Sequence, residues 1–105
     1  MKSYSVVFTP EAEEQLAELY RYIADNASPE IAERYTGAVI TLCEGMRSVP
    51  HRGTRRDDIR PGLRITSYRR GTVIAFAVDA DQVSIIGVFY GGRDYETALR
   101  PAPDD

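Results

Sequence analysis

The chain opens on an alternation of apolar and polar residues and then changes to a helical period. Tyr4, Val6 and Phe8 alternate with smaller or polar neighbours, which predicts a short strand. Thr9-Pro10-Glu11 is typical of a helix start, because it supplies a capping hydroxyl, a proline at the first position and an early acid. Apolar positions then follow at helical spacing: Ala12, Leu16, Leu19, Tyr20 and Ile23. Asp25-Asn26 ends this predicted helix.

Ser28-Pro29-Glu30 repeats the helix-start signal. One apolar stripe follows it: Ala32, Tyr35, Val39, Leu42, Met46 and Val49. We expect this second helix to end at Pro50 and to pack antiparallel on the first, because the connection is only about three residues long. Tyr20 and Tyr35 lie on the apolar stripes and are expected in the core, whereas Tyr22 lies off the stripe.

Residues 50–62 combine prolines, glycines and arginines and are predicted to form a loop. Three predicted strands come next, separated by turns short enough for hairpins: Leu63 to Tyr68, Thr72 to Val78 and Gln82 to Tyr90. The predicted class is therefore α+β in the order β-α-α-β-β-β, with an N-terminal αα-hairpin on one face of a mainly antiparallel sheet. We expect one domain over 1–98 and a short polar tail over 99–105.

Composition limits the possible classes of protein. A chain of 105 residues supports one modest core and leaves little interior for a deep cofactor pocket. The single cysteine, Cys43, excludes an intrachain disulfide and a cysteine-based zinc site. The first residues contain no long apolar h-region, and no apolar run approaches the length of a membrane span. We therefore expect a cytoplasmic protein with no membrane association.

Charge is unevenly distributed along the chain, although the net charge is only −3. Residues 47–70 carry eight arginines against two aspartates, whereas the flanking segments are acidic. Arginine favours bidentate contact with carboxylate or phosphate, so this stretch predicts an anionic partner, either an RNA backbone or an acidic protein segment. A solvated basic face that pairs with the acidic helices is the alternative, and the negative net charge argues against general nucleic-acid binding.

Catalytic and cofactor motifs are mostly missing. His51 is the only histidine, so neither a triad nor a metal set is expected, and Gly91-Gly92-Arg93 lacks the spacing of a nucleotide fold. We predict no cofactor and no metal. The residues expected to bind a partner are Arg56, Arg60, Arg64, Tyr68, Arg69, Arg70, Tyr90 and Arg93. Metal-free RNA cleavage is the alternative chemistry, and the residues to carry it would be Arg64, Arg70, Arg93 and Tyr95.

The arginines are expected to differ in importance because of where they lie. If Leu63 and Ile65 face the helices, Arg64 points to the opposite face of the sheet. Arg70 falls in a predicted hairpin turn, and Arg93 lies just past the last strand. These three arginines are expected to converge on one anion.

Three short stretches resemble the ParE/RelE superfamily of bacterial toxins: Val7 to Glu13, Ile59 to Arg64, and Val88 to Asp94. The resemblance is closer to ParE than to RelE. ParE-like chains usually end the last strand with a His-Gly-Ala-Arg-Asp type of sequence, and Tyr90-Gly91-Gly92-Arg93-Asp94 keeps the glycine, the arginine and the acid. RelE-type nucleases are richer in lysine, whereas this chain has one lysine.

The resemblance implies the toxin of a type II toxin–antitoxin pair, a class associated with plasmid stabilisation. Its cognate antitoxin would wrap the toxin and would itself bind operator DNA, so no sequence-specific DNA binding by this chain is expected. The resemblance to ParE implies DNA gyrase as the target. Two alternatives stay open, namely a RelE-like ribosome-dependent mRNA endoribonuclease and an inactive, toxin-like protein-binding module.

Overall fold

The computed structural model describes residues 3–101 and has the predicted α+β order. Its elements are β1 (Ser5–Phe8), α1 (Pro10–Asn26), α2 (Pro29–Glu44), the 3₁₀ turn η1 (Gly45–Arg47), β2 (Thr54–Arg55), β3 (Leu63–Tyr68), β4 (Thr72–Val78), β5 (Gln82–Tyr90) and α3 (Tyr95–Leu99). The last three strands have the predicted bounds. The strand β2 and the helix α3 were not predicted.

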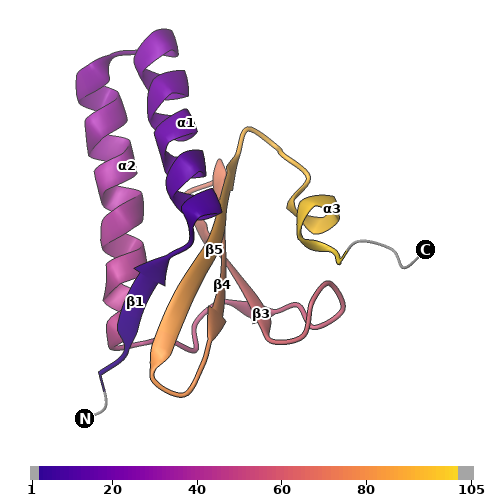
Figure 1. The fold of residues 1–105 in the computed structure, drawn as a ribbon. Coiled ribbons are helices and arrows are strands. Elements are labelled where there is room, and N and C mark those ends of the chain that lie inside the picture. The colour runs from indigo at the N-terminus through magenta and orange to yellow at the C-terminus, as the bar shows by residue number, and fades with distance from the viewer. Residues whose placement is uncertain (1–2, 102–105) are drawn as a thin grey trace.

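The five strands form one sheet in the order β1-β5-β4-β3-β2. The β1 strand runs parallel to β5, and the other neighbours are antiparallel. Figure 1 shows the α1–α2 hairpin on one side of this sheet and the short α3 on the other. The predicted placement of the hairpin on one face of a mainly antiparallel sheet is therefore confirmed.

Both predicted helix starts are confirmed. The Thr9 hydroxyl accepts a hydrogen bond from the Ala12 amide at 3.1 Å, and the Ser28 hydroxyl accepts one from the Ile31 amide at 3.1 Å. Each cap satisfies one of the amides that a helix N-terminus leaves unpaired.

The predicted end of the second helix at Pro50 is wrong, because α2 ends at Glu44 and continues only as the tighter turn η1. Glycine at position 45 weakens the helix at this point. The Tyr4 amide also donates to the Arg47 carbonyl at 2.9 Å, which ties the turn to the start of β1. Met46 is buried as its place on the stripe suggested, but Val49 is 57% exposed.

Apolar residues cover both faces of the central strands. Phe76 and Ile74 of β4 belong to the main core under the α1–α2 hairpin. Ala75, between them, belongs to a second cluster with Phe89 on the α3 side. Successive residues of this strand therefore belong to different clusters, as the alternation of side chains requires.

Two side-chain and loop predictions need correction or completion. Tyr20 is 36% exposed rather than a core residue, because it lies one position past the buried Leu19, at the edge of the α1 stripe. Tyr35 packs against the main core as predicted. The predicted loop 50–62 contains β2, since Thr54 pairs with Ile65 and extends the sheet by one short strand.

The expected boundary between the domain and the polar tail falls inside α3. Leu99 is 5% exposed and belongs to the second cluster, so the packed structure extends at least to this residue. Residues 102–105 of the expected tail lie outside the described residues. Between residues 3 and 101, no helix is long and apolar enough to cross a membrane.

Candidate functional site

Several side chains expected to bind a partner gather at one end of the sheet, where the β3–β4 turn meets the end of β5. Thr72 pairs with Tyr90 across β4 and β5, and the Gly91 amide donates to the Gly71 carbonyl at 3.3 Å. This pairing holds the arginine-bearing turn beside the loop that follows β5. The side chains gathered there are Tyr68, Arg69, Arg70, Tyr90 and Arg93.

Arg93 rests on an aromatic stack. Its guanidinium carbon lies 4.8 Å from the centroid of the Tyr90 ring, and its Nη2 donates to the Tyr90 hydroxyl at 3.4 Å. The Tyr22 ring of α1 lies 5.4 Å from the Tyr90 ring, centroid to centroid. The guanidinium is attracted by the ring face without losing its charge. The stack therefore positions Arg93 and leaves it able to bind an anion.

A second stack of the same kind stands beside the first. The guanidinium carbon of Arg69 lies 5.5 Å from the Tyr68 ring centroid, and the Tyr68 ring meets Tyr35 edge-on at 5.1 Å. The Tyr35 and Thr72 hydroxyls share a hydrogen bond of 2.7 Å, which anchors the stack to β4. Arg69 has φ of 55°, a backbone conformation that non-glycine residues rarely adopt. The turn is thus built so that Arg69 projects over Tyr68.

Arg56 is engaged within the chain. It forms two hydrogen bonds of 2.9 Å with Asp58, and it also donates to the Tyr95 hydroxyl at 3.1 Å and to Glu96 at 3.3 Å. The hydrogen bond with Asp58 is the main cause that raises the pKa of Arg56 and lowers that of Asp58. Arg56 therefore links the loop that follows β2 with the helix α3, and the Tyr95 hydroxyl is part of this hydrogen-bond network.

Arg64 does not lie where we expected it. Leu63 and Ile65 pack in the second cluster, away from the α1–α2 hairpin, so Arg64 projects from the same face as its cross-strand partner Phe76. Its Nη1 donates to the Arg52 carbonyl at 3.2 Å. The error arose because both faces of the sheet are apolar, so alternation alone does not identify the helix-facing side.

The arginines of the proposed nuclease set do not converge. Arg64 is the second residue of β3, whereas Arg70 lies in the turn after its last residue, Tyr68. Residues 64 and 68 alone are about 13 Å apart, because a strand rises about 3.3 Å per residue. Arg93 stacks on Tyr90 under the helix hairpin, whereas Tyr95 lies 6.2 Å from Phe89 on the α3 side. Arg70 and Arg93 remain at the same end of the sheet.

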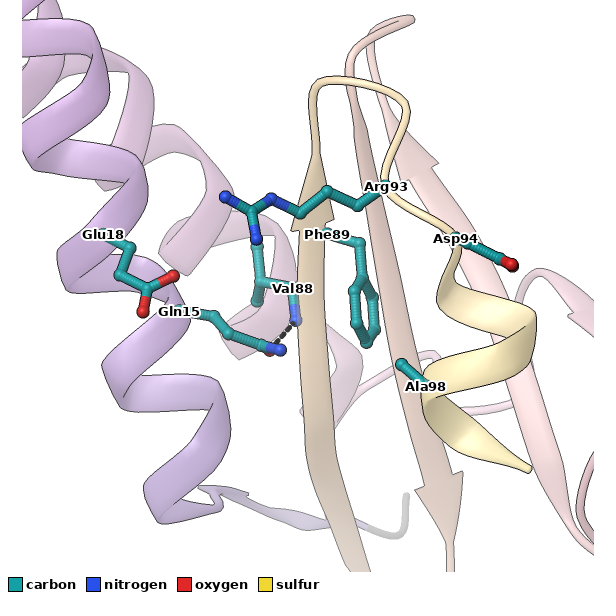
Figure 2. Close-up of a pocket in the computed structure, with 7 residues that line it drawn as sticks. All are labelled: Gln15, Glu18, Val88, Phe89, Arg93, Asp94 and Ala98. Atoms are coloured by element: carbon teal, nitrogen blue, oxygen red, sulfur yellow. Dashed lines mark hydrogen bonds between the residues drawn. The ribbon is translucent and has the colours of Figure 1, made fainter. Parts of the chain in front are cut away.

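A polar concavity runs along β5 between α1 and α3, and we call it the β5 cleft. One part has a volume of about 390 Å³ and is lined by Gln15, Glu18, Val88, Phe89, Arg93, Asp94 and Ala98. A neighbouring part of about 460 Å³ continues to Thr9, Glu11 and Arg60. Figure 2 shows Arg93 reaching across the end of β5 toward α1, while Gln15 and Glu18 point into the cleft from that helix.

The β5 cleft exists because β1 is shorter than β5. The parallel pairing stops at Phe8 and Ile85, so residues 86–90 have no strand on that side. Side chains take its place. Gln15 Oε1 accepts a hydrogen bond from the Val88 amide at 2.7 Å, and the Thr9 hydroxyl donates to the Ile86 carbonyl at 3.2 Å. The cleft is therefore a partly capped sheet edge between two helices.

The side chains that line the β5 cleft can bind a ligand through hydrogen bonds and ionic contacts. Arg93 and Arg60 supply cations, and Glu11, Glu18 and Asp94 supply carboxylates. Hydrogen bonds from Thr97 lower the pKa of Asp94, which caps α3 and stays ionised at neutral pH. Gly91 and Gly92, with φ of 66° and 75°, form the turn that brings Arg93 back toward α1.

Neither reactive side chain singled out in the sequence lies in the cleft. His51 packs edge-on against Tyr4 with ring centroids 6.2 Å apart, just before the start of β1. Burial raises the pKa of Cys43 to about 12, so its thiol stays protonated and unreactive. Within the described part of the chain, no group of three or more His, Cys, Asp or Glu residues could hold a metal ion.

The family of this chain follows from comparison with known proteins. A family model described as the ParE toxin of the type II toxin–antitoxin system parDE matches residues 6–95. The match spans most of the sequence, including both tyrosine stacks and the whole lining of the β5 cleft except Ala98 and Leu99. The chain therefore belongs to the ParE toxin family of type II toxin–antitoxin systems. No curated protein sequence matches it significantly.

Two solved structures share the fold at low sequence identity. A chain from the chromosomal ParDE toxin–antitoxin system of P. aeruginosa superposes with a TM-score of 0.74 and 20% identity, over 84% of this chain and 96% of that one. A chain of the RelBE2 toxin–antitoxin complex from Mycobacterium tuberculosis gives a TM-score of 0.60 and 21% identity, over 85% and 99%. Both structures establish likeness of fold.

Sequence reasoning missed the α1 side of the candidate site. Gln15 and Glu18 lie off the apolar stripe of α1, where polar residues are ordinary, so no local signal marks them. Tyr22 could have been identified from the sequence, because a large aromatic residue on the polar face of a helix indicates a contact with another element or with a binding partner. Its partner, Tyr90, is distant in sequence and could not be identified from spacing.

Proposed function

We propose that this chain inhibits growth by binding DNA gyrase and is neutralised by a cognate antitoxin encoded beside it. The observation that supports a binding function best is the placement of Arg93. It is exposed, it is held on the Tyr90 ring, and it stands at the edge of the β5 cleft. A preorganised arginine next to a concave surface is well suited to binding another macromolecule, since arginine and tyrosine are common anchor residues of protein interfaces.

Gyrase is favoured over messenger RNA as the target, because Arg64 and Tyr95 of the nuclease alternative lie away from Arg70 and Arg93. RNA cleavage without a metal needs groups placed together around one phosphate. Arg64 lies at the far end of β3, and the Tyr95 hydroxyl accepts a hydrogen bond from Arg56. Family membership adds support, because gyrase is the target that the resemblance to ParE implies.

The antitoxin part of the proposal rests on family membership and on both structural neighbours, each of which comes from a toxin–antitoxin system. The expected complex has one antitoxin chain per toxin chain, as a 1:1 or 2:2 assembly. Co-expression with the neighbouring reading frame and co-purification test it. If no associated protein is recovered, this part of the proposal is wrong.

A pair of assays with purified protein tests the target. Gyrase supercoiling of relaxed plasmid is measured with wild-type chain, with Arg93→Ala and with the control Arg21→Ala, whose exposed side chain pairs with Glu14 on α1. We expect wild type and Arg21→Ala to inhibit supercoiling equally, and we expect Arg93→Ala to be a weaker inhibitor. Ribosome-bound messenger RNA is examined in parallel. Cleaved message with normal supercoiling supports the RelE-like alternative, and no effect in either assay supports an inactive binding module.

A further inference from the structure

Arg60 lies at the end of the β5 cleft opposite Arg93. It lines the part of the cleft that contains Thr9 and Ile86, whereas Arg93 lines the other part and stacks on Tyr90. Residues 86 and 90 of β5 are about 13 Å apart, because a strand rises about 3.3 Å per residue. The cleft therefore carries one guanidinium near each of its ends.

The loop that carries Arg60 is closed by its own backbone. The Arg56 amide donates to the Leu63 carbonyl at 2.8 Å, and the Arg60 amide donates to the Arg56 carbonyl at 3.2 Å. The Leu63 amide donates in turn to the Arg60 carbonyl at 3.1 Å, and Ile59 is buried in the second cluster. The backbone at Arg60 is thus fixed before any ligand arrives, so binding costs it little conformational entropy.

The Arg60 guanidinium is half-buried and has no carboxylate partner. In the part of the chain from residue 3 to residue 101, no Asp or Glu oxygen lies within ion-pair distance of it. Arg56, which is in the same loop, is instead neutralised by Asp58 at 2.9 Å and Glu96 at 3.3 Å. Arg60 therefore keeps its N–H donors for an anion that enters the cleft.

We propose that Arg60 is a second anion-binding residue of the β5 cleft, and that the cleft selects a target segment whose two acidic side chains reach Arg60 and Arg93 together. The inference rests on the proposed function, since the segment would belong to gyrase. In an extended chain, side chains four residues apart lie on one face and are separated by about 13 Å, which matches the two ends of the cleft. The ligand is therefore an extended segment with acidic residues at positions i and i+4.

A protein segment fits the cleft better than a nucleic acid does. Glu11 and Glu18 of α1 and Asp94 at the start of α3 also line the cleft. A DNA strand carries one phosphate charge per about 3.4 Å, so it would place charges beside these carboxylates as well as beside the arginines. A segment with two spaced acids avoids that repulsion, and Phe89, which lines both parts of the cleft, offers an apolar contact to the residues between them.

Arg56 is a positioning residue for Arg60. Its side chain links the loop to α3 through Glu96, and its carbonyl accepts the Arg60 amide hydrogen. Without this guanidinium the loop loses its link to α3, whereas α3 itself keeps Leu99 in the second cluster. Arg56 lines neither part of the cleft, so it acts on the ligand only through the placement of Arg60.

The anion-binding role is tested by gyrase supercoiling, with purified gyrase holoenzyme as the probe. Arg60→Ala is compared with the matched control Arg34→Ala, whose exposed side chain lies on α2, outside the cleft lining, and forms no ion pair with the described residues. We expect half-inhibition by Arg60→Ala to need a roughly ten- to a hundredfold higher concentration, and Arg34→Ala to match wild type. If Arg60→Ala inhibits like Arg34→Ala, Arg60 does not bind the target.

The positioning role is tested by combining variants whose folding at the assay temperature is checked by thermal melting. Arg56→Ala should weaken inhibition, and the double variant with Arg60→Ala should be no weaker than Arg60→Ala alone, because both changes act on one contact. Arg56→Lys keeps the charge but loses the paired contact with Asp58, so it should lie between wild type and Arg56→Ala. Losses that multiply in the double variant contradict the positioning role.

The spacing is tested with two blocked, threonine-rich peptides of equal length and charge, one with aspartates four residues apart and one with adjacent aspartates. Binding to wild-type chain is followed by the NMR amide shifts of Arg60 and Arg93. We expect the first peptide to shift both residues and to bind about tenfold more tightly. Equal affinity of the two peptides means that the spacing is wrong, and tighter binding of an oligothymidylate means that the cleft takes a nucleic acid instead.

The two proposals fail in different ways. If wild-type chain leaves supercoiling unchanged, the gyrase part of the proposed function fails, and the peptides still decide whether the cleft binds paired acids. If wild type inhibits supercoiling and Arg60→Ala inhibits equally, only the inference about Arg60 fails.

Discussion

Gln15→Ala gives the sharpest test of the capped sheet edge. The Gln15 side chain accepts the Val88 amide hydrogen at 2.7 Å, and Val88 is only 1% exposed. Removing the acceptor leaves a covered N–H donor without a protein partner, which costs about 1–3 kcal/mol. Water entering through the β5 cleft would satisfy part of this donor, so we expect about 1–2 kcal/mol.

The assay for Gln15→Ala is urea denaturation at equilibrium, with thermal unfolding as a second readout. A loss of 1 kcal/mol should lower Tm by about 4–8 °C in a domain of this size. The control is Gln82→Ala, which breaks a side-chain hydrogen bond of 3.1 Å to Ser84 but leaves no backbone amide unpaired. Gln15→Glu should restore stability at neutral pH, because a carboxylate also accepts the amide hydrogen. If the free energies of unfolding of Gln15→Ala and Gln82→Ala agree within about 0.5 kcal/mol, Gln15 does not cap the edge of β5 as described.

Three further predictions concern stability and reactivity. Cys43 should resist the thiol reagent DTNB in native protein at mildly alkaline pH and react in denaturant, since burial raises its pKa to about 12; rapid native labelling would contradict its burial. The pKa of Asp58 is lowered below its ordinary 3.8 by Arg56, so its contribution to stability is present above that pH and is lost on acidification. Asp58→Asn should therefore unfold more easily at neutral pH and lose less stability in acid, and denaturation curves parallel to those of wild type at every pH would refute this. Leu99→Ala should cost about 2 kcal/mol, at the low end for a buried leucine because α3 is short and able to shift; an unchanged urea midpoint would mean that α3 is not part of the packed domain.

The strands and the helix starts could be predicted because their signals are local. Hairpin turns separate the last three strands from one another, and Thr9 and Ser28 cap the helices within three residues of their own positions. The end of α2 depends on a contact between Arg47 and Tyr4, which are far apart in sequence, so the stripe alone predicted too long a helix. The five-residue α3 is too short for a periodic pattern to be detected.

The candidate site could be predicted in part. Arginine-rich composition drew attention to the turn at Arg69 and Arg70, and the ParE-like ending drew attention to Arg93. The sequence did not distinguish these arginines from Arg56, which the structure places in a network with Asp58 and Glu96. Which arginine meets a carboxylate is decided by tertiary packing, and residues 40 positions apart in this network carry no sequence signal of proximity.

The pairing of β1 with β5 constrains how the chain folds as it is synthesised. Val7 pairs with Ser84, so β1, which is synthesised first, cannot form its strand pairing until β5 has been synthesised. Until then the apolar stripes of α1 and α2 have no β5 to cover them, because Ile85 and Val88 complete the main core. Closing so long a loop is slow relative to local contacts. A nascent chain that stops before Gln82 therefore lacks β5, the stack of Arg93 on Tyr90 and the β5 cleft, and a truncated product should be inert and open to proteolysis.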